Sequence, residues 1–376
     1  MKIIYVTIFI SLLCTLCCCK NEGQYSPDEQ KATSIPEIKD TLSAKKLQYS
    51  DLLPQWAFCT ESYVVLIDRS DDAIIKVVDA HNDSLISAFG TKGRGRNELT
   101  HPCSDCYFDK NVKGELCMLV PTSQPCTYVV NMSASLAKGV CVVDTVYKED
   151  GMSLSSRLFY LDGGKKNVLH KEMWFDGDAS DVNNVRTPEL MVLADDSIRL
   201  SAFSRLIRVD QSFAHLMYRS TCALNPIGTK FVEVYNTHNT MNIYDMVNNQ
   251  VLGVQFGNEG NLDEIEGKYL NASLEKAIKE LKIYNVLCCA SNDYIFVTHE
   301  DNITIADSEN REKFSPSLLV FDWNGNCIAN FALKENLVSI AYNDVCKKLY
   351  GLDYNDNLYS YDMKDLLPLY KKKNRD

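Results

Sequence analysis

The sequence predicts an all-β protein, folded as a six-bladed β-propeller with four-stranded antiparallel blades and with loop and helical insertions on one face. Three observations lead to this prediction. A short apolar run that ends in Asp or Asn, followed by a turn and a second run, occurs six times along the chain. Two further strand-like runs lie upstream of each copy, which gives four strands per unit. Two matching Phe-Gly-x-x-Gly turns occupy equivalent places between units.

Each copy of the repeat is expected to form a hairpin around a pivot residue. Asp and Asn tolerate turn conformations and hydrogen-bond their own backbone two residues further on. In the fifth copy, Asn324-Gly325 is a strong hairpin signal. The copies span 74–90, 127–143, 205–220, 241–257, 317–333 and 357–370, with pivots at Asp79, Asn131, Asp210, Asp245, Asp322 and Asp362. Their spacing is irregular, so the long intervals imply insertions. A β-sandwich with coincidental hairpins and a seventh blade within 144–189 are the alternatives.

The last copy indicates how the ring closes. It has three clear strands, but its fourth run, 367–370, contains Pro368, which removes a backbone donor from a sheet. Residues 40–50 are therefore expected to provide the missing outer strand, so that the two ends of the chain pair.

Length and charge limit the classes of protein that remain. The 376 residues, of which 45% are hydrophobic, are enough for one large all-β domain. The formal net charge of −11 disfavours a nucleic-acid partner, because phosphate binding needs clustered cations.

The N-terminus reads as an export signal. Lys2 precedes an apolar run at 3–16, which is too short to span a bilayer comfortably and suits a signal peptide. The following Leu16-Cys17-Cys18-Cys19 resembles a bacterial lipobox, and this resemblance implies a lipid on Cys19. Lipidation at Cys18 and an ordinary signal peptide are the alternatives.

These features give an expected organisation and location. It comprises a lipoprotein signal peptide at 1–18, a lipid anchor and flexible tether at 19–45, the propeller at 46–370 and a charged tail at 371–376. The lipid anchor makes the membrane a partner. It predicts a place in the cell envelope, on the outer membrane, facing the periplasm or the surface.

The fifteen cysteines do not form an obvious disulfide framework. Four belong to the signal and anchor region, and the remaining eleven are an odd number. Most lie in apolar runs, so we expect buried thiols, with room for one bridge.

The glycine-rich stretch 89–102, FGTKGRGRNELTHP, is expected to be a turn between blades. Glycine permits the positive φ angles of a tight crossover, and the Phe can pack between blades. The stretch matches neither a P-loop nor a Rossmann fingerprint. With Glu98, Leu99 and Pro102 it resembles the inter-blade signature of NHL-like and TolB-like six-bladed propellers. The run 318–362 resembles the final blades of TolB-like propeller lipoproteins of Bacteroidetes. The resemblance covers roughly residues 50–365 and implies fold and export, but little about chemistry.

A binding surface is expected where the insertions emerge. The insertions at 144–189, 262–285 and 300–316 map to connections on one face, together with the cations Lys92, Arg94 and Arg96. The second insertion has a helical pattern, formed by Leu274, Ala277, Ile278 and Leu281. The alternative is that the three cations are solvated turn residues.

Catalytic and metal motifs are weak. Cys103 and Cys106 form a lone CxxC, and 299–310 lacks the spacing of an EF-hand, so no metal and no cofactor are expected. We therefore predict a binding module for a protein, peptide or glycan, not for nucleic acid. Whether it is an enzyme is left open, with a non-enzymatic role favoured. The alternative is a metal-dependent hydrolase of gluconolactonase type, for which the first strands offer Asp105, Asp109 and Asn225.

Overall fold

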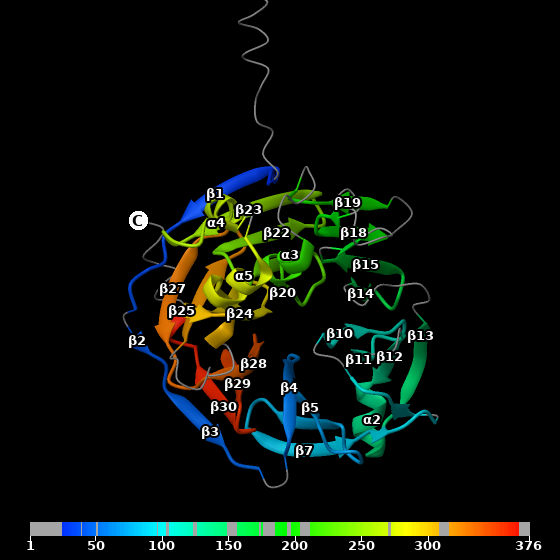
Figure 1. The fold of residues 1–376 in the computed structure, drawn as a ribbon. Coiled ribbons are helices and arrows are strands. Elements are labelled where there is room, and N and C mark those ends of the chain that lie inside the picture. Colours follow the sequence, from blue (N-terminus) through cyan, green and yellow to red (C-terminus); the bar gives the residue numbers. More distant parts are fainter. Residues whose placement is uncertain are drawn as a thin grey trace, which may run out of the picture.

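The computed structural model shows a ring of six blades around a central channel, which confirms the predicted fold class (Figure 1). It describes residues 25–367 except 39, 50–51, 96, 103–104, 123–125, 149–155, 173, 176–184, 194–196, 204–210, 270–271 and 308–315. The predicted signal peptide, Cys19 and the charged tail lie outside the described residues.

Each blade is an antiparallel sheet of four strands that follow one another from the channel outwards. Blade 1 contains β4 (Pro54–Cys59), β5 (Tyr63–Asp68), β6 (Ile75–Asp79) and β7 (Ser84–Phe89). Blade 2 contains β10 (Tyr107–Lys110), β11 (Leu116–Pro121), β12 (Cys126–Asn131) and β13 (Val143–Lys148). Blade 3 contains β14 (Ser156–Leu161), β15 (Lys166–Lys171), β18 (Glu189–Leu193) and β19 (Ile198–Leu200).

The other three blades follow the same order. Blade 4 contains β20 (Ser220–Leu224), β21 (Lys230–Tyr235), β22 (Thr240–Asp245) and β23 (Gln250–Phe256). Blade 5 contains β24 (Lys282–Ala290), β25 (Tyr294–Thr304), β26 (Ser317–Asp322) and β27 (Cys327–Ala332). Blade 6 contains β28 (Leu337–Asn343), β29 (Lys348–Asp353), β30 (Leu358–Asp362) and β3 (Ala44–Leu47). The candidate hairpin for a seventh blade is β14–β15 of blade 3.

The ring closes as the sequence predicts. Strand β3 pairs antiparallel with β30, so a strand from the start of the chain completes the last blade. Leu47 at the end of β3 is buried, and it packs into the cluster formed by blades 6 and 1.

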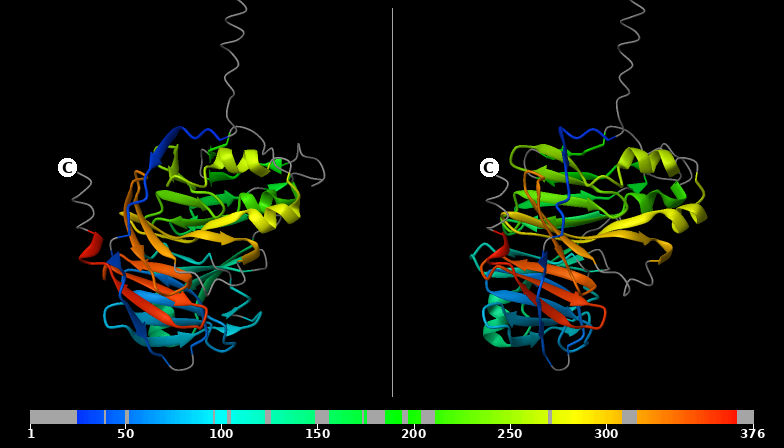
Figure 2. Two further views of the ribbon diagram at one scale, coloured as in Figure 1. Left: turned by 60° about the vertical axis from the view of Figure 1, so that its left-hand side comes forward. Right: turned by 90° about the vertical axis from the view of Figure 1, so that its left-hand side faces the viewer.

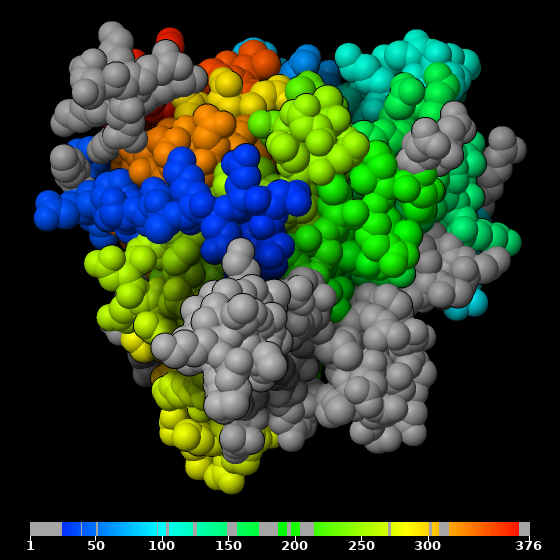
Figure 3. Space-filling view, turned by 90° about the horizontal axis from the view of Figure 1, so that it is seen from above, coloured from blue at the N-terminus to red at the C-terminus, as the bar shows by residue number. Residues whose placement is uncertain are grey.

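The expected tether at 19–45 is wrong in its extent, because residues 25–47 bind the outside of the ring. We call this segment the strap. Strand β1 (Glu29–Thr33) pairs parallel with β23, and β2 (Asp40–Thr41) pairs parallel with β27, each as a fifth strand. The backbone of the strap satisfies hydrogen bonds that the edges of blades 4 and 5 would otherwise expose. Figure 3 shows the strap in blue, lying across the rim of these two blades.

The pivot residues act as expected in four of the six copies. Asp79, Asp245, Asp322 and Asp362 each accept a hydrogen bond from the backbone N–H two residues further on. Asn131 instead caps helix α2 (Met132–Lys138), which lies between β12 and β13 and ends at Gly139.

The third copy was interpreted wrongly. Helix α3 (Gln211–Met217) occupies the predicted hairpin, and the pivot Asp210 lies outside the described residues. The outer pair of blade 3 is formed upstream by β18 and β19. Ala214 and Met217, three residues apart, are both buried, so a helical period was mistaken for a strand pattern.

The long connections emerge on one face of the ring, which we call the helix face (Figure 2). It carries α3, α4 (Leu262–Tyr269), α5 (Leu274–Glu280) and the small sheet of β16 (Trp174–Phe175) and β17 (Val185–Arg186). Helix α2 lies on the opposite face, the α2 face. The predicted helical pattern at 274–281 is confirmed by α5, in which Ala277 is buried while Leu274 and Ile278 remain exposed.

None of the ten described cysteines forms a disulfide. Cys106, Cys117, Cys141 and Cys327 are buried, which agrees with the expectation of core thiols.

Candidate functional site

The central channel encloses a hollow with a volume of about 1380 Å³. Its walls are the innermost strands β4, β10, β14, β20, β24 and β28, so all six blades contribute. The apolar part of the lining is rich in aromatic side chains. These are Trp56, Phe58, Tyr63, Tyr107, Phe108, Phe159 and Tyr342.

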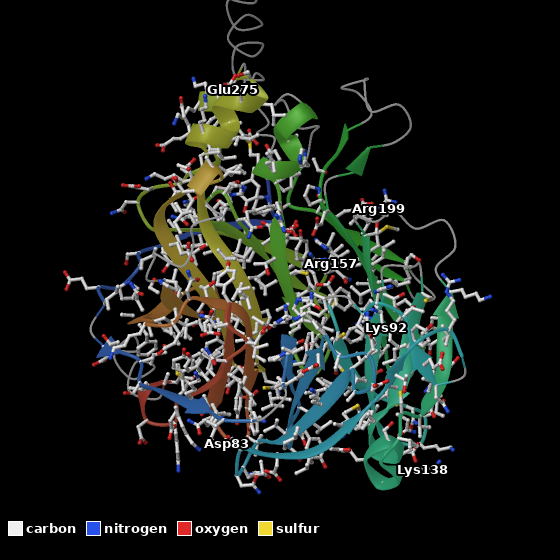
Figure 4. All side chains as sticks on the ribbon, turned by 60° about the horizontal axis from the view of Figure 1, so that its bottom comes forward. Asp83, Lys92, Lys138, Arg157, Arg199 and Glu275 are labelled. Carbon is white, nitrogen blue, oxygen red and sulfur yellow. The ribbon has the colours of Figure 1, made fainter. Side chains whose placement is uncertain are left out.

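A charged cluster lies where the channel opens on the helix face. Arg157, near the start of β14, points into the ring (Figure 4). Its Nε lies 3.4 Å from Asp105 Oδ2 and one terminal nitrogen lies 3.0 Å from Glu172 Oε1. The other terminal nitrogen donates to Cys222 Sγ at 2.7 Å. One guanidinium thus faces two carboxylates.

The electrostatics of this cluster favour a fixed cation and a neutral thiol. Burial alone would lower the pKa of Arg157, but the adjacent thiol and the two carboxylates raise it above its ordinary value. Burial raises the pKa of Cys222 to about 12. This thiol is therefore protonated at neutral pH and lacks the thiolate character of an activated nucleophile.

Other thiols line the channel wall in the same state. Cys59, Cys288 and Cys289 are half-buried residues of β4 and β24 that contact the cavity. Burial raises the pKa of all three. The channel wall therefore presents protonated thiols in addition to the charged cluster at its mouth.

The cations predicted as a binding site lie away from the channel. Lys92 is exposed and forms an ion pair with Asp71, with the charged atoms 3.2 Å apart. Arg94 is exposed, and Arg96 lies outside the described residues. Neither Lys92 nor Arg94 lines the channel cavity.

The glycines of this stretch have a structural role in the turn between blades 1 and 2. Two short strands, β8 (Thr91–Lys92) and β9 (Glu98–Leu99), pair across it. The Glu98 carboxylate accepts the N–H of Gly95 at 2.6 Å. A Cβ at Gly93 would overlap this carboxylate, and Gly90 has a φ of 90°.

The residues considered for a metal-dependent hydrolase have other partners. Asp105 faces Arg157, while Asp109, at the other end of β10, accepts the N–H of Gly163 at 2.9 Å. Four residues of strand separate these two carboxylates by about 13 Å. Asn225 accepts the N–H of Thr229 and of Lys230 within a turn. Across the described residues, no three His, Cys, Asp or Glu side chains gather as metal ligands.

The remaining motifs also take structural positions. Cys103 lies outside the described residues, and Cys106 is buried in the core of blades 1 and 2. The first residues of the acidic stretch 299–310 belong to a strand, because β25 continues to Thr304. His299 is buried and bonds Asn285 at 3.0 Å.

Sequence reasoning missed Arg157 and Glu172. They lie 15 residues apart in the chain and belong to β14 and to the connection after β15. The available signal was the run 157–161 at the start of a strand pair. Arg157 can be placed in the channel only once this run is known to be the innermost strand of blade 3.

No protein-family model matches this sequence, and no curated protein is similar to it. Among solved structures, the chain is similar to a Bacteroides fragilis protein described as exported, with 12% identity and a TM-score of 0.52 over 88% of this chain and 98% of the other. It is also similar to a DUF4221 family member from Bacteroides vulgatus, with 13% identity and a TM-score of 0.51 over 86% of this chain and 98% of the other. At this identity the similarity shows the fold alone.

Neither description mentions a TolB-like or NHL-like family, so that resemblance stays a prediction. Among the helices that the structure describes, none is long and apolar enough to cross a bilayer.

Proposed function

We propose that this chain is an exported, lipid-anchored binding protein whose ligand enters the central channel from the helix face. The observation that carries this proposal is the channel itself. A cavity of about 1380 Å³ has aromatic walls and a charged mouth built around Arg157. Ligand sites typically combine an apolar concave surface with a few polar groups that fix orientation.

The position of the insertions supports the same face. The connections that carry α3, α4 and α5 emerge beside the mouth, and Leu216 of α3 contributes to the channel lining. Loops on a rigid scaffold carry binding residues disproportionately. Lys92, Arg94 and Arg96 belong to a connection on this face, and we retain them as a second, outer contact for an acidic ligand.

The ligand class that fits is a segment of a protein, peptide or glycan. The aromatic walls can pack against apolar side chains or sugar rings. The mouth offers both donors and acceptors, because Asp105 and Glu172 remain partly exposed beside Arg157. A metal-dependent hydrolase is not favoured, since Asp109 and Asn225 are committed to backbone turns.

Export and lipidation rest on the N-terminal sequence. The similar Bacteroides fragilis protein is described as exported, which agrees with this part of the proposal.

Peptide and glycan arrays with Arg157→Gln test the channel. The matched control is Arg199→Gln, an exposed arginine on the rim in β19 that also pairs with a carboxylate. We expect at least one peptide or glycan that binds the native protein to bind Arg157→Gln about tenfold more weakly and the control equally well. Equal binding of every such ligand by all three proteins would refute the channel as a site. The charge-reversed pair Arg94→Glu and Arg96→Glu tests the outer contact in the same assay.

A further inference from the structure

A second hollow lies on the α2 face, between blades 4 and 5, with a volume of about 760 Å³. We call it the turn pocket. It is lined by the β24–β25 turn, the β26–β27 turn, the start of β21 and residues Thr33 and Ser34 of the strap. It is distinct from the channel, with which it shares only Asn292 among its lining residues.

One wall of the turn pocket is fixed by a hydrogen-bond network. Asp322 Oδ1 accepts the N–H of Asn324 at 3.0 Å and of Asn326 at 2.9 Å. Asn326 Nδ2 donates to Asp322 Oδ2 at 2.8 Å. Lys31 of the strap reaches Asn326 Oδ1 at 2.5 Å and the carbonyl oxygen of Asn324 at 2.9 Å. The turn is therefore held in place before any ligand arrives.

Three polar side chains around this wall have no internal partner. Within the described part of the chain, the amides of Asn292 and Asn324 and the carboxylate of Asp293 make no hydrogen bond, and all three residues are exposed. The two amides each offer donors and an acceptor, and the carboxylate offers acceptors.

The apolar lining of the turn pocket includes two aromatic rings beside Cys327 and Ile328. Trp323 is anchored by its indole N–H, which donates to the carbonyl oxygen of Ser291 at 3.1 Å. The ammonium group of Lys230 lies 6.0 Å from the centre of this ring. Tyr294 adds a second ring to the lining.

The charges identify the class of ligand. Two carboxylates, of Asp293 and Asp322, are balanced by the ammonium groups of Lys31 and Lys230, so the pocket has no strong preference for either sign. Amides and carboxylates beside aromatic rings suit hydroxyl groups, which donate and accept, on a ring with apolar faces. We propose that the turn pocket binds a neutral saccharide, independently of the ligand in the channel.

The chain offers a matched control for this site. The turn that follows β29 repeats the same pattern, and Asp353 Oδ1 accepts the N–H of Asn355 at 2.8 Å and of Asn357 at 2.9 Å. Asn355 therefore corresponds to Asn324 in sequence and local geometry, but it does not line the turn pocket.

Saturation-transfer difference NMR with glucose, galactose, mannose, N-acetylglucosamine, maltose and lactose tests the proposal. We expect at least one of these saccharides to bind the native protein. The variant Asn292→Ala with Asn324→Ala should bind it at least about tenfold more weakly. Asn355→Ala and Arg157→Gln should bind it as the native protein does, and circular dichroism checks that all variants are folded.

Three results would overturn the proposal. The first is that none of the saccharides binds the native protein, and the second is that the double variant binds as well as the native protein. The third is that Arg157→Gln loses binding while the double variant keeps it, which would place the saccharide in the channel and leave the proposed function standing.

Discussion

Replacing Glu233 with Gln should destabilise the ring, because this carboxylate joins blades 3 and 4 in a dry interface. Glu233 lies on β21 and is fully buried. Its Oε1 lies 3.1 Å from His170 Nε2 of β15 and accepts from Ser220 Oγ at 3.2 Å. Its Oε2 accepts from three further groups, the hydroxyls of Tyr235 and Tyr244 and the amide of Asn242, at 3.0, 2.9 and 3.2 Å.

The magnitude follows from this geometry. A glutamine replaces one carboxylate oxygen with an NH₂ group. Two donors point at Oε1 and three at Oε2, so in either orientation the NH₂ group faces donors and favourable contacts become repulsive. Leaving buried donors unsatisfied costs about 1–3 kcal/mol, and more where the lost acceptor was charged. We take about 3 kcal/mol for a substitution that preserves shape. At an unfolding entropy of about 0.7 kcal/mol/K for a ring of this size, the melting temperature should fall by about 4 °C.

Thermal unfolding followed by circular dichroism measures this change. The control is Glu275→Gln on α5, since Glu275 is exposed and pairs with Lys279 along the helix. The reasoning would be refuted if the melting temperature of Glu233→Gln differed from that of the control by less than about 1 °C.

The dependence on pH provides an independent check. Burial alone would raise the pKa of Glu233, but the hydrogen bonds from His170, Tyr244 and Asn242 hold it below its ordinary value of 4.5. A lowered pKa stabilises the folded state above the unfolded-state pKa, and this contribution is lost as the pH falls through the folded-state pKa. The difference in stability between the native protein and Glu233→Gln should therefore be largest above pH 4.5 and shrink below it.

Three further predictions concern the two ends of the ring and its first turn. Deleting residues 20–50 removes β1, β2 and β3, and the loss of their backbone pairing should lower the melting temperature by several degrees; an unchanged melting curve would contradict this closure. Cys19→Ala should release the protein from the membrane fraction on cell fractionation, and retention there would show that the anchor is misassigned. Gly90→Ala should destabilise the ring by about 1–2 kcal/mol in urea unfolding, because the φ of 90° at this position strains a residue that carries a Cβ, and an unchanged midpoint would argue against a fixed turn.

The repeat could be read from the sequence because its chemistry is local. Asp79, Asp245, Asp322 and Asp362 end apolar strands and bind their own backbone, which one sequence window reveals. The closure by residues 40–50 was predictable from Pro368 and a missing strand. Asn131 misled because the interaction that starts a turn also caps a helix, and in this chain it starts α2.

The site could not be read in this way because its contacts are distant along the chain. Arg157 meets Asp105 and Cys222 only because β10, β14 and β20 surround the channel. Strand β1 gave no signal either. Its side chains are mostly exposed, so it is held by backbone pairing to β23 and carries no apolar period.

The structure of the outer strands of the blades indicates that partners bind the faces of the ring and not its rim. The strap covers the edges of blades 4 and 5 with parallel strands. Blades 1 and 2 have no such cover among the described strands, but both outer strands carry a bulge. Ile86 of β7 and Asp144 of β13 are the residues left without a partner in the register. A bulge twists an edge strand and interrupts its row of free backbone groups, which hinders pairing with another chain. Because the outer edges of blades 1, 2, 4 and 5 are either covered or interrupted, we expect partners to bind the channel mouth on the helix face and the turn pocket on the α2 face, where polar side chains stay available.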